Sequence, residues 1–139
     1  MTYLVDTNIW LQVLRSRSRA DEVRRFLESV PPPELAVTDY AVHSVGLILA
    51  RFGQLDRYGD FLHDSMIGQQ VAMLALSPPQ LAQLAATCRS QRLDFDDAYH
   101  HLIAEIHDLQ IVSFDSDFDR TTRGRRTPAD VLQSLTDEK

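Results

Sequence analysis

Short apolar runs alternate with longer segments of helical periodicity along most of the chain. Strands are predicted at residues 2–5, 35–38, 71–76 and 110–114. Helices are predicted between and around them, at residues 8–14, 21–30, 39–52, 56–66, 79–92 and 95–109. Strands separated by helices favour a parallel sheet with helices on both faces. The sequence therefore predicts an α/β fold of three layers, α/β/α, around a central and mostly parallel sheet.

Length and composition narrow the classes of protein to consider. With 139 residues, of which 44% are hydrophobic and 24% charged, the chain is expected to form one domain over residues 1–139. No run reaches the roughly 20 apolar residues that span a bilayer. The N-terminus shows no secretory pattern and Cys88 is the only cysteine, so a cytoplasmic protein without a membrane anchor is expected.

The charge distribution is uneven. A formal net charge of −6 argues against a domain that coats nucleic acid by bulk attraction. Arginines nevertheless cluster in the segment "RTTRGRR" at residues 120–126. Arginine suits phosphate oxygens, so this segment is either a rim that contacts phosphates or a solvated charged tail.

Acidic residues follow the first and last predicted strands. Asp6 comes after the strand at 2–5, and Asp115 comes after the strand at 110–114. Ligands bind at the carboxyl ends of parallel strands, so neighbouring strands would direct both acids into one crevice. The alternative for Asp6 is structural, because Asp6, Thr7 or Asn8 would each serve as the N-cap of the following helix.

A third acidic position opens the helix in "LDFDDAYHHLIAEIHDL". Asp94 and Asp97 have the spacing of a capping box. With Asp96, the first turn holds three acids, which is more than capping requires. Asp97 stands next to Ala98 of the apolar stripe and is therefore expected to lie close to the sheet. His100 and His101 are expected to be a surface pair. The stripe expected to face the core consists of Phe95, Ala98, Tyr99, Leu102, Ile103 and Ile106.

The segment "VSFDSDFDR" places Asp115, Asp117 and Asp119 within five residues. Such carboxylates resist ionising together unless a cation lies among them, although turn chemistry alone also selects Asp after a strand. A calcium loop of the EF-hand type is excluded, because Arg120 and Arg126 stand where Gly and Glu are needed. Carboxylate ligands suit Mg²⁺ or Mn²⁺, and the leading chemistry is metal-assisted hydrolysis of a phosphate ester.

Three motifs in this order resemble the PIN domain, the fold of VapC-type toxin ribonucleases. They are Asp6-Thr7-Asn8, Asp97-Ala98 and the run from Ser113 to Phe118. The resemblance implies Mg²⁺- or Mn²⁺-dependent cleavage of RNA, with Asp6, Asp97 and Asp115 as metal ligands and Asp117 as a further catalytic acid. It makes Thr7, Asn8 and Ser113 polar supports, and it implies a homodimer and an antitoxin protein as partners.

One position departs from the family pattern. PIN domains usually carry a Glu on the helix after the second strand, where this chain has Ser44, with His43 beside it and Asp39 over one turn earlier. Asp39, His43 and Ser44 therefore stay open as members of the site. The alternative function is a PIN-like module that binds RNA or protein and cleaves weakly or not at all.

Overall fold

A computed structural model describes residues 1–138, and its centre is a four-stranded sheet in the order β3-β2-β1-β4. All three strand pairings are parallel. The predicted α/β class is confirmed. The strands are β1 (Tyr3–Val5), β2 (Leu35–Thr38), β3 (Ala72–Leu74) and β4 (Gln110–Val112).

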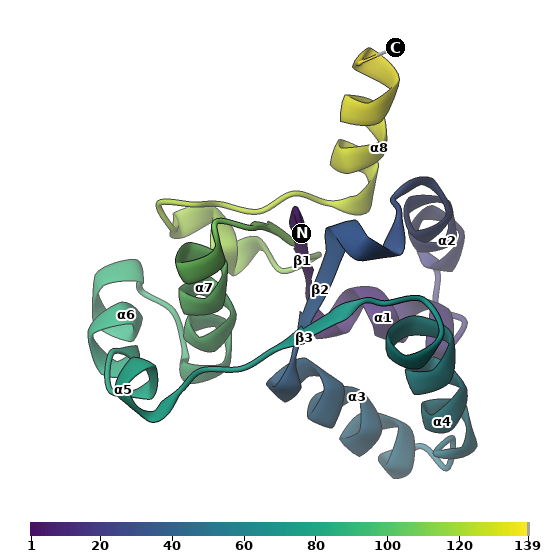
Figure 1. Cartoon of the computed structure of the whole chain (residues 1–139), viewed down its shortest axis with the longest axis horizontal. Coiled ribbons are helices and arrows are strands. Elements are labelled where there is room, and N and C mark those ends of the chain that lie inside the picture. The colour runs from purple at the N-terminus through teal and green to yellow at the C-terminus, as the bar shows by residue number, and fades with distance from the viewer. Residues whose placement is uncertain (139) are drawn as a thin grey trace.

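Helices connect the strands and cover the sheet (Figure 1). Short 3₁₀ turns, η1 (Pro32–Glu34) and η3 (Ser116–Arg120), and a π-helical turn, η2 (His63–Ile67), supplement them. The α-helices are α1 (Thr7–Leu14), α2 (Ala20–Ser29), α3 (Asp39–Arg51), α4 (Asp56–Leu62), α5 (Pro78–Leu81), α6 (Leu84–Gln91), α7 (Phe95–His107) and α8 (Pro128–Asp137).

Side-chain alternation along the strands divides the core into two clusters, one on each face of the sheet. Val5 and Val112 point to the face covered by α1, α2, α3 and α8. Leu4 and Ile111 point to the opposite face, where α6 and α7 pack. Figure 1 shows α5, α6 and α7 together on one side of the strands and α1 to α4 on the other. The expected three-layer arrangement is confirmed.

Two helical segments differ from the prediction. The segment predicted as one helix at 79–92 is two helices, because Gln83 N–H bonds Gln80 O across three residues and ends α5. Helix α8 was not expected. Its signal is a capping box in which Thr127 and Asp130 bond each other's backbone N–H groups.

The buried face of α7 includes Ala98, Tyr99, Leu102 and Ile103 of the predicted stripe but extends beyond it. Phe95 and Ile106 of the predicted stripe are 60% and 40% exposed, whereas His100 and His101 are 3% and 0% exposed. The surface-pair interpretation of the two histidines is wrong. Helix α7 lies between the sheet and α6, so its buried face is wider than a single apolar stripe.

His101 is a polar side chain in this apolar layer. Neither of its ring nitrogens has a hydrogen-bond partner, and Nε2 lies 3.6 Å from Glu105 Oε2. Burial lowers the pKa of His101. The neutral imidazole therefore behaves here as a packing group.

Across the described residues, no helix has the length and apolar character to cross a membrane.

Candidate metal centre

Parallel pairing of β1 with β4 brings together the residues that follow these two strands. Val5 pairs with Val112, and Asp6 N–H donates to Val112 O at 3.0 Å. Asp6 and Ser113 are therefore neighbours at the carboxyl edge of the sheet. The condition for a shared crevice, that these two strands are neighbours, is therefore met.

Asp6 is held by donors on both of its oxygens. Its Oδ1 accepts from Thr7 N–H at 2.7 Å, and its Oδ2 accepts from Ser113 Oγ at 2.6 Å and from Asn8 Nδ2 at 3.4 Å. Asn8 also bonds Ser113 Oγ and accepts from Phe114 N–H, so it links the start of α1 to the segment after β4. Asp6 is 7% exposed and is the N-cap of α1. The structure thus surrounds Asp6 with the three expected polar supports, Thr7 contributing its backbone N–H.

Three other carboxylates form a tight group beside Asp6. One oxygen from each of Asp97, Asp115 and Asp117 lies within 4.8 Å of the others. Asp97 sits in the first turn of α7, where its N–H bonds the N-cap Asp94 at 3.0 Å. Asp115 caps η3 by accepting from Asp117 N–H at 2.9 Å. Capping therefore explains how these residues are placed, and it leaves carboxylate oxygens facing one another.

The electrostatics of Asp97 reflect this crowding. Burial, followed by the charges of Asp94, Asp115, Asp6 and Asp117, raises the pKa of Asp97 to about 7. Asp6 thus acts electrostatically on Asp97, although its oxygens lie outside the tight group. A divalent cation would relieve this repulsion, and oxygen ligands with open positions for water suit Mg²⁺ or Mn²⁺. The donor set therefore fits such an ion.

Neither Asp39 nor His43 of α3 belongs to the tight group. Asp39 accepts from Tyr40 N–H at 2.8 Å and from the Tyr99 hydroxyl at 2.7 Å, so it ties α3 to α7. His43 is exposed and Ser44 is partly buried. Burial and the adjacent Asp96 raise the pKa of Tyr40. Among the described residues, α3 therefore contributes no carboxylate to the group formed by Asp97, Asp115 and Asp117.

His100 contacts the site although it was not among the predicted site residues. Its Nε2 lies 3.5 Å from Asp6 Oδ1, and its Nδ1 lies 3.3 Å from Thr38 Oγ1. The signal in the sequence is its spacing of three residues from Asp97, which puts the two side chains on one side of α7.

The arginines of residues 120–126 form structural contacts. Arg125 bonds Asp119 through two nitrogens, at 3.0 and 3.2 Å, and Arg123 bonds Asp108 at 2.9 Å. The side chains of Arg123 and Arg125 are only 26% and 18% exposed, so the interpretation of this segment as a solvated tail is wrong. Asp119 is thereby directed to Arg125 and is not part of the acidic group.

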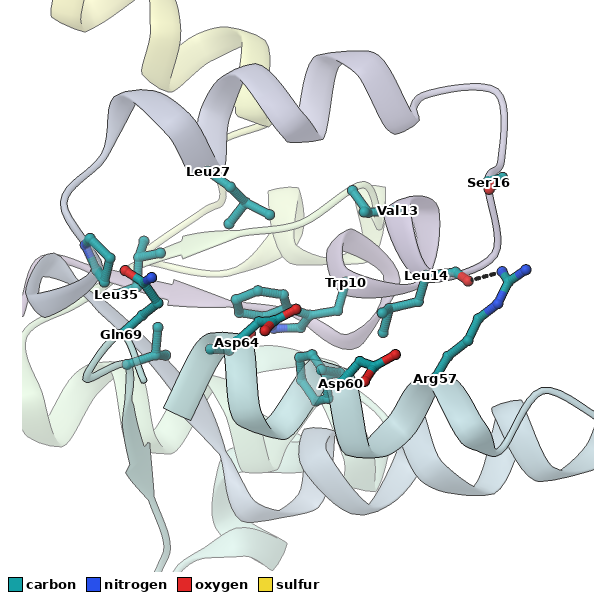
Figure 2. Close-up of a pocket in the computed structure, with 14 residues that line it drawn as sticks. Trp10, Val13, Leu14, Ser16, Leu27, Leu35, Arg57, Asp60, Asp64 and Gln69 are labelled. Carbon is teal, nitrogen blue, oxygen red and sulfur yellow. Dashed lines mark hydrogen bonds between the residues drawn. The ribbon is translucent and has the colours of Figure 1, made fainter. Parts of the chain in front are cut away.

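A cleft outside the acidic group lies on the other side of the sheet from α6 and α7. It has a volume of about 630 Å³ and runs between α1, α2 and the α4–η2 segment (Figure 2). Trp10, Leu27 and Phe61 line it, together with Arg57 and Asp60. None of the predicted site residues lines this cleft.

Comparison with known proteins identifies the class of this fold and site. The family model described as PIN domain matches residues 3–124. The chain belongs to the PIN domain family. A search of curated protein sequences finds no significant match.

Solved structures with the same fold come from several organisms. A toxin–antitoxin complex from Klebsiella pneumoniae matches with a TM-score of 0.73 and 21% identity, over 91% of this chain and 98% of that one. PAE2754 from Pyrobaculum aerophilum matches with a TM-score of 0.69 and 21% identity, over 99% and 96% of the two chains. VapC20 from Mycobacterium tuberculosis, described as a toxin that cleaves the sarcin–ricin loop, matches with a TM-score of 0.70 and 17% identity, over 85% and 93%.

The raised pKa of Asp97 makes stability depend on pH. An unfolded Asp ionises near pH 3.9, whereas folded Asp97 ionises at about 7. The stability that this group contributes is therefore fully present below about pH 4 and is lost as the pH rises through about 7. We expect Asp97→Asn to raise the Tm of the metal-free protein more at about pH 8 than at about pH 4, measured by thermal unfolding in EDTA. Asp56→Asn, an exposed acid on α4, is the control, and an equal Tm change at both pH values would contradict the prediction.

Proposed function

We propose that this protein is a divalent-metal-dependent ribonuclease that hydrolyses phosphodiester bonds in RNA. The observation that carries the proposal is the meeting of Asp97, Asp115 and Asp117 oxygens within 4.8 Å, next to the buried Asp6. This group occupies the carboxyl edge of a parallel sheet, which is where ligands bind in such folds. Membership of the PIN domain family supports the same activity.

In this proposal, Asp97, Asp115 and Asp117 hold Mg²⁺ or Mn²⁺, and Asp6 completes the set. The cation would act as a Lewis acid on the phosphodiester and lower the pKa of the attacking water. Asn8, Ser113 and the Thr7 backbone fix the Asp6 carboxylate by the hydrogen bonds described above. Asp94 adds negative charge near Asp97 and thereby favours cation binding.

The second function to be tested is a PIN-like module that binds RNA or protein with weak or no cleavage. Ser44 favours it, because α3 brings no carboxylate to the acidic group among the residues that the structure describes. Fewer anionic ligands mean weaker binding of a hard cation.

We further propose that the protein is the toxin of a toxin–antitoxin pair and forms a homodimer, as the family resemblance implies. A toxin–antitoxin complex is among the proteins with this fold. An antitoxin would mask the acidic site by placing a basic side chain among the carboxylates.

Removal of a carboxylate from the acidic group should abolish cleavage. We expect Asp115→Asn to reduce cleavage of a mixed RNA substrate by about 100-fold or more in Mn²⁺, because the cation loses an anionic ligand. Asp119→Asn is the matched control, since Asp119 lies in the same segment but bonds Arg125. Cleavage by the wild type in EDTA, or equal cleavage by Asp115→Asn, would refute the proposed activity.

The missing helix carboxylate gives a second test. If Ser44 occupies the place of the family's Glu, Ser44→Glu should tighten Mn²⁺ binding and Asp6→Asn should weaken it. Calorimetric titration of the wild type and the two variants measures both changes. A Ser44→Glu variant with unchanged or lower affinity would show that this helix position does not face the site.

The antitoxin proposal is tested by co-expression. We expect expression of the chain alone to slow growth, and co-expression with the product of an adjacent gene to restore growth and give a stable complex. Size-exclusion chromatography with light scattering measures the complex and the expected homodimer. Normal growth without any co-purifying neighbour would count against a toxin.

A further inference from the structure

His100 joins three elements that meet at the acidic site. It lies on α7, one turn beyond Asp97, and is 3% exposed. Its Nε2 lies 3.5 Å from Asp6 Oδ1 at the end of β1, and its Nδ1 lies 3.3 Å from Thr38 Oγ1 at the end of β2. The Tyr40 ring packs against the imidazole edge-on, with ring centroids 5.8 Å apart. The imidazole is thus enclosed between two polar partners and an aromatic ring.

The two polar neighbours of the imidazole indicate which ring nitrogen carries the proton. Asp6 Oδ1 is a carboxylate oxygen 3.5 Å from Nε2, so a favourable contact between them requires Nε2 to carry a proton. Thr38 Oγ1 accepts from Ala41 N–H at 2.9 Å and caps α3. Within the described part of the chain, its hydroxyl proton has His100 Nδ1 as its acceptor. A proton on Nδ1 would leave that hydroxyl without an acceptor in a fully buried position.

We propose that His100 is a positioning residue for Asp6, acting as the Nε2–H tautomer that donates to Asp6 Oδ1 and accepts from Thr38. This inference rests on the proposed metal site, because its consequence is the placement of one of that site's carboxylates. The other described donors to Asp6 come from the start of α1 and the segment after β4. His100 adds the link to α7, the helix that carries Asp97. It therefore fixes the separation between Asp6 and Asp97, which lie on different elements.

The contact between His100 and Asp6 is expected to affect cation binding more strongly in this chain, because α3 carries Ser44 where the family pattern has a carboxylate. With fewer anionic ligands, the affinity for a cation depends more strongly on the accurate placement of those that remain. Hydrogen-bond partners of metal ligands typically change metal affinity by about 10- to 100-fold when they are removed.

The tautomer is tested on the metal-free wild-type chain. Long-range ¹H–¹⁵N NMR spectra distinguish a protonated Nε2 from a protonated Nδ1. We expect His100 to show a protonated Nε2 and an unprotonated Nδ1, and we expect the Nε2–H signal to shift in Asp6→Asn. A proton on Nδ1, or a signal unaffected by Asp6→Asn, would overturn the inference without any need for a His100 variant to fold.

The positioning role is tested by calorimetric Mn²⁺ titration of folded variants. His100→Leu should weaken Mn²⁺ binding by about 10-fold or more, and His100→Gln, whose amide nitrogen can replace Nε2–H, should recover most of the affinity. His101→Leu is the control, since His101 is buried next to His100 but has no hydrogen-bond partner. Unchanged binding in His100→Leu, or equal losses in the Leu and Gln variants, would overturn the role. If the wild type binds no Mn²⁺, the proposed function fails, while the NMR result still decides whether His100 donates to Asp6.

Discussion

The parallel pairing of β1 with β4 is the interaction on which the site depends. It joins the first strand of the chain to the last, and the Asp6 N–H to Val112 O bond extends the pairing past the end of β1. The pairing makes Ser113 available to Asp6, and Ser113 in turn bonds the Asp115 N–H. The capping bonds at the starts of α7 and η3 then orient the carboxylates of Asp97 and Asp115. Without this pairing, the acids at the two strand ends would have no shared edge of the sheet.

The acidic centre is a place where local order and global stability oppose each other. Each of Asp6, Asp94 and Asp115 is a good N-cap and stabilises the turn or helix that follows it. Together their charges, with burial, raise the pKa of Asp97 and so disfavour the fully ionised site. Satisfied backbone groups and repelling carboxylates coexist because capping uses the oxygens that face the backbone. A protein that needed only caps would gain stability from Asn or Ser at several of these positions.

Periodicity was sufficient to predict the fold class and the bounds of β2. The pairing of β1 with β4 was only a condition of the predicted site, because strand order does not follow from periodicity. The burial of α7 was not predictable in the same way, because it depends on α6 packing against a helix face that carries His100 and His101. Hydropathy treats histidine as polar, whereas its neutral ring packs like an aromatic group. Helix α8 was not predicted, because residues 120–126 were interpreted by their charge and the capping signal at Thr127 was not used. The membership of the acidic group, with Asp117 inside and Asp6 beside it, depends on side-chain geometry that spacing does not determine.

The bond between Ser113 and Asp6 spans 107 positions of the chain, and the Ser113 N–H bonds Arg126 O further along. During synthesis, Asp6 leaves the ribosome 107 residues before its partner Ser113. Long-range contacts of this kind form late, after the local helices. The nascent chain therefore carries its acids separately until Ser113 and the residues that follow it have been made. The parallel topology delays the assembly of the acidic group until β4 has paired with β1.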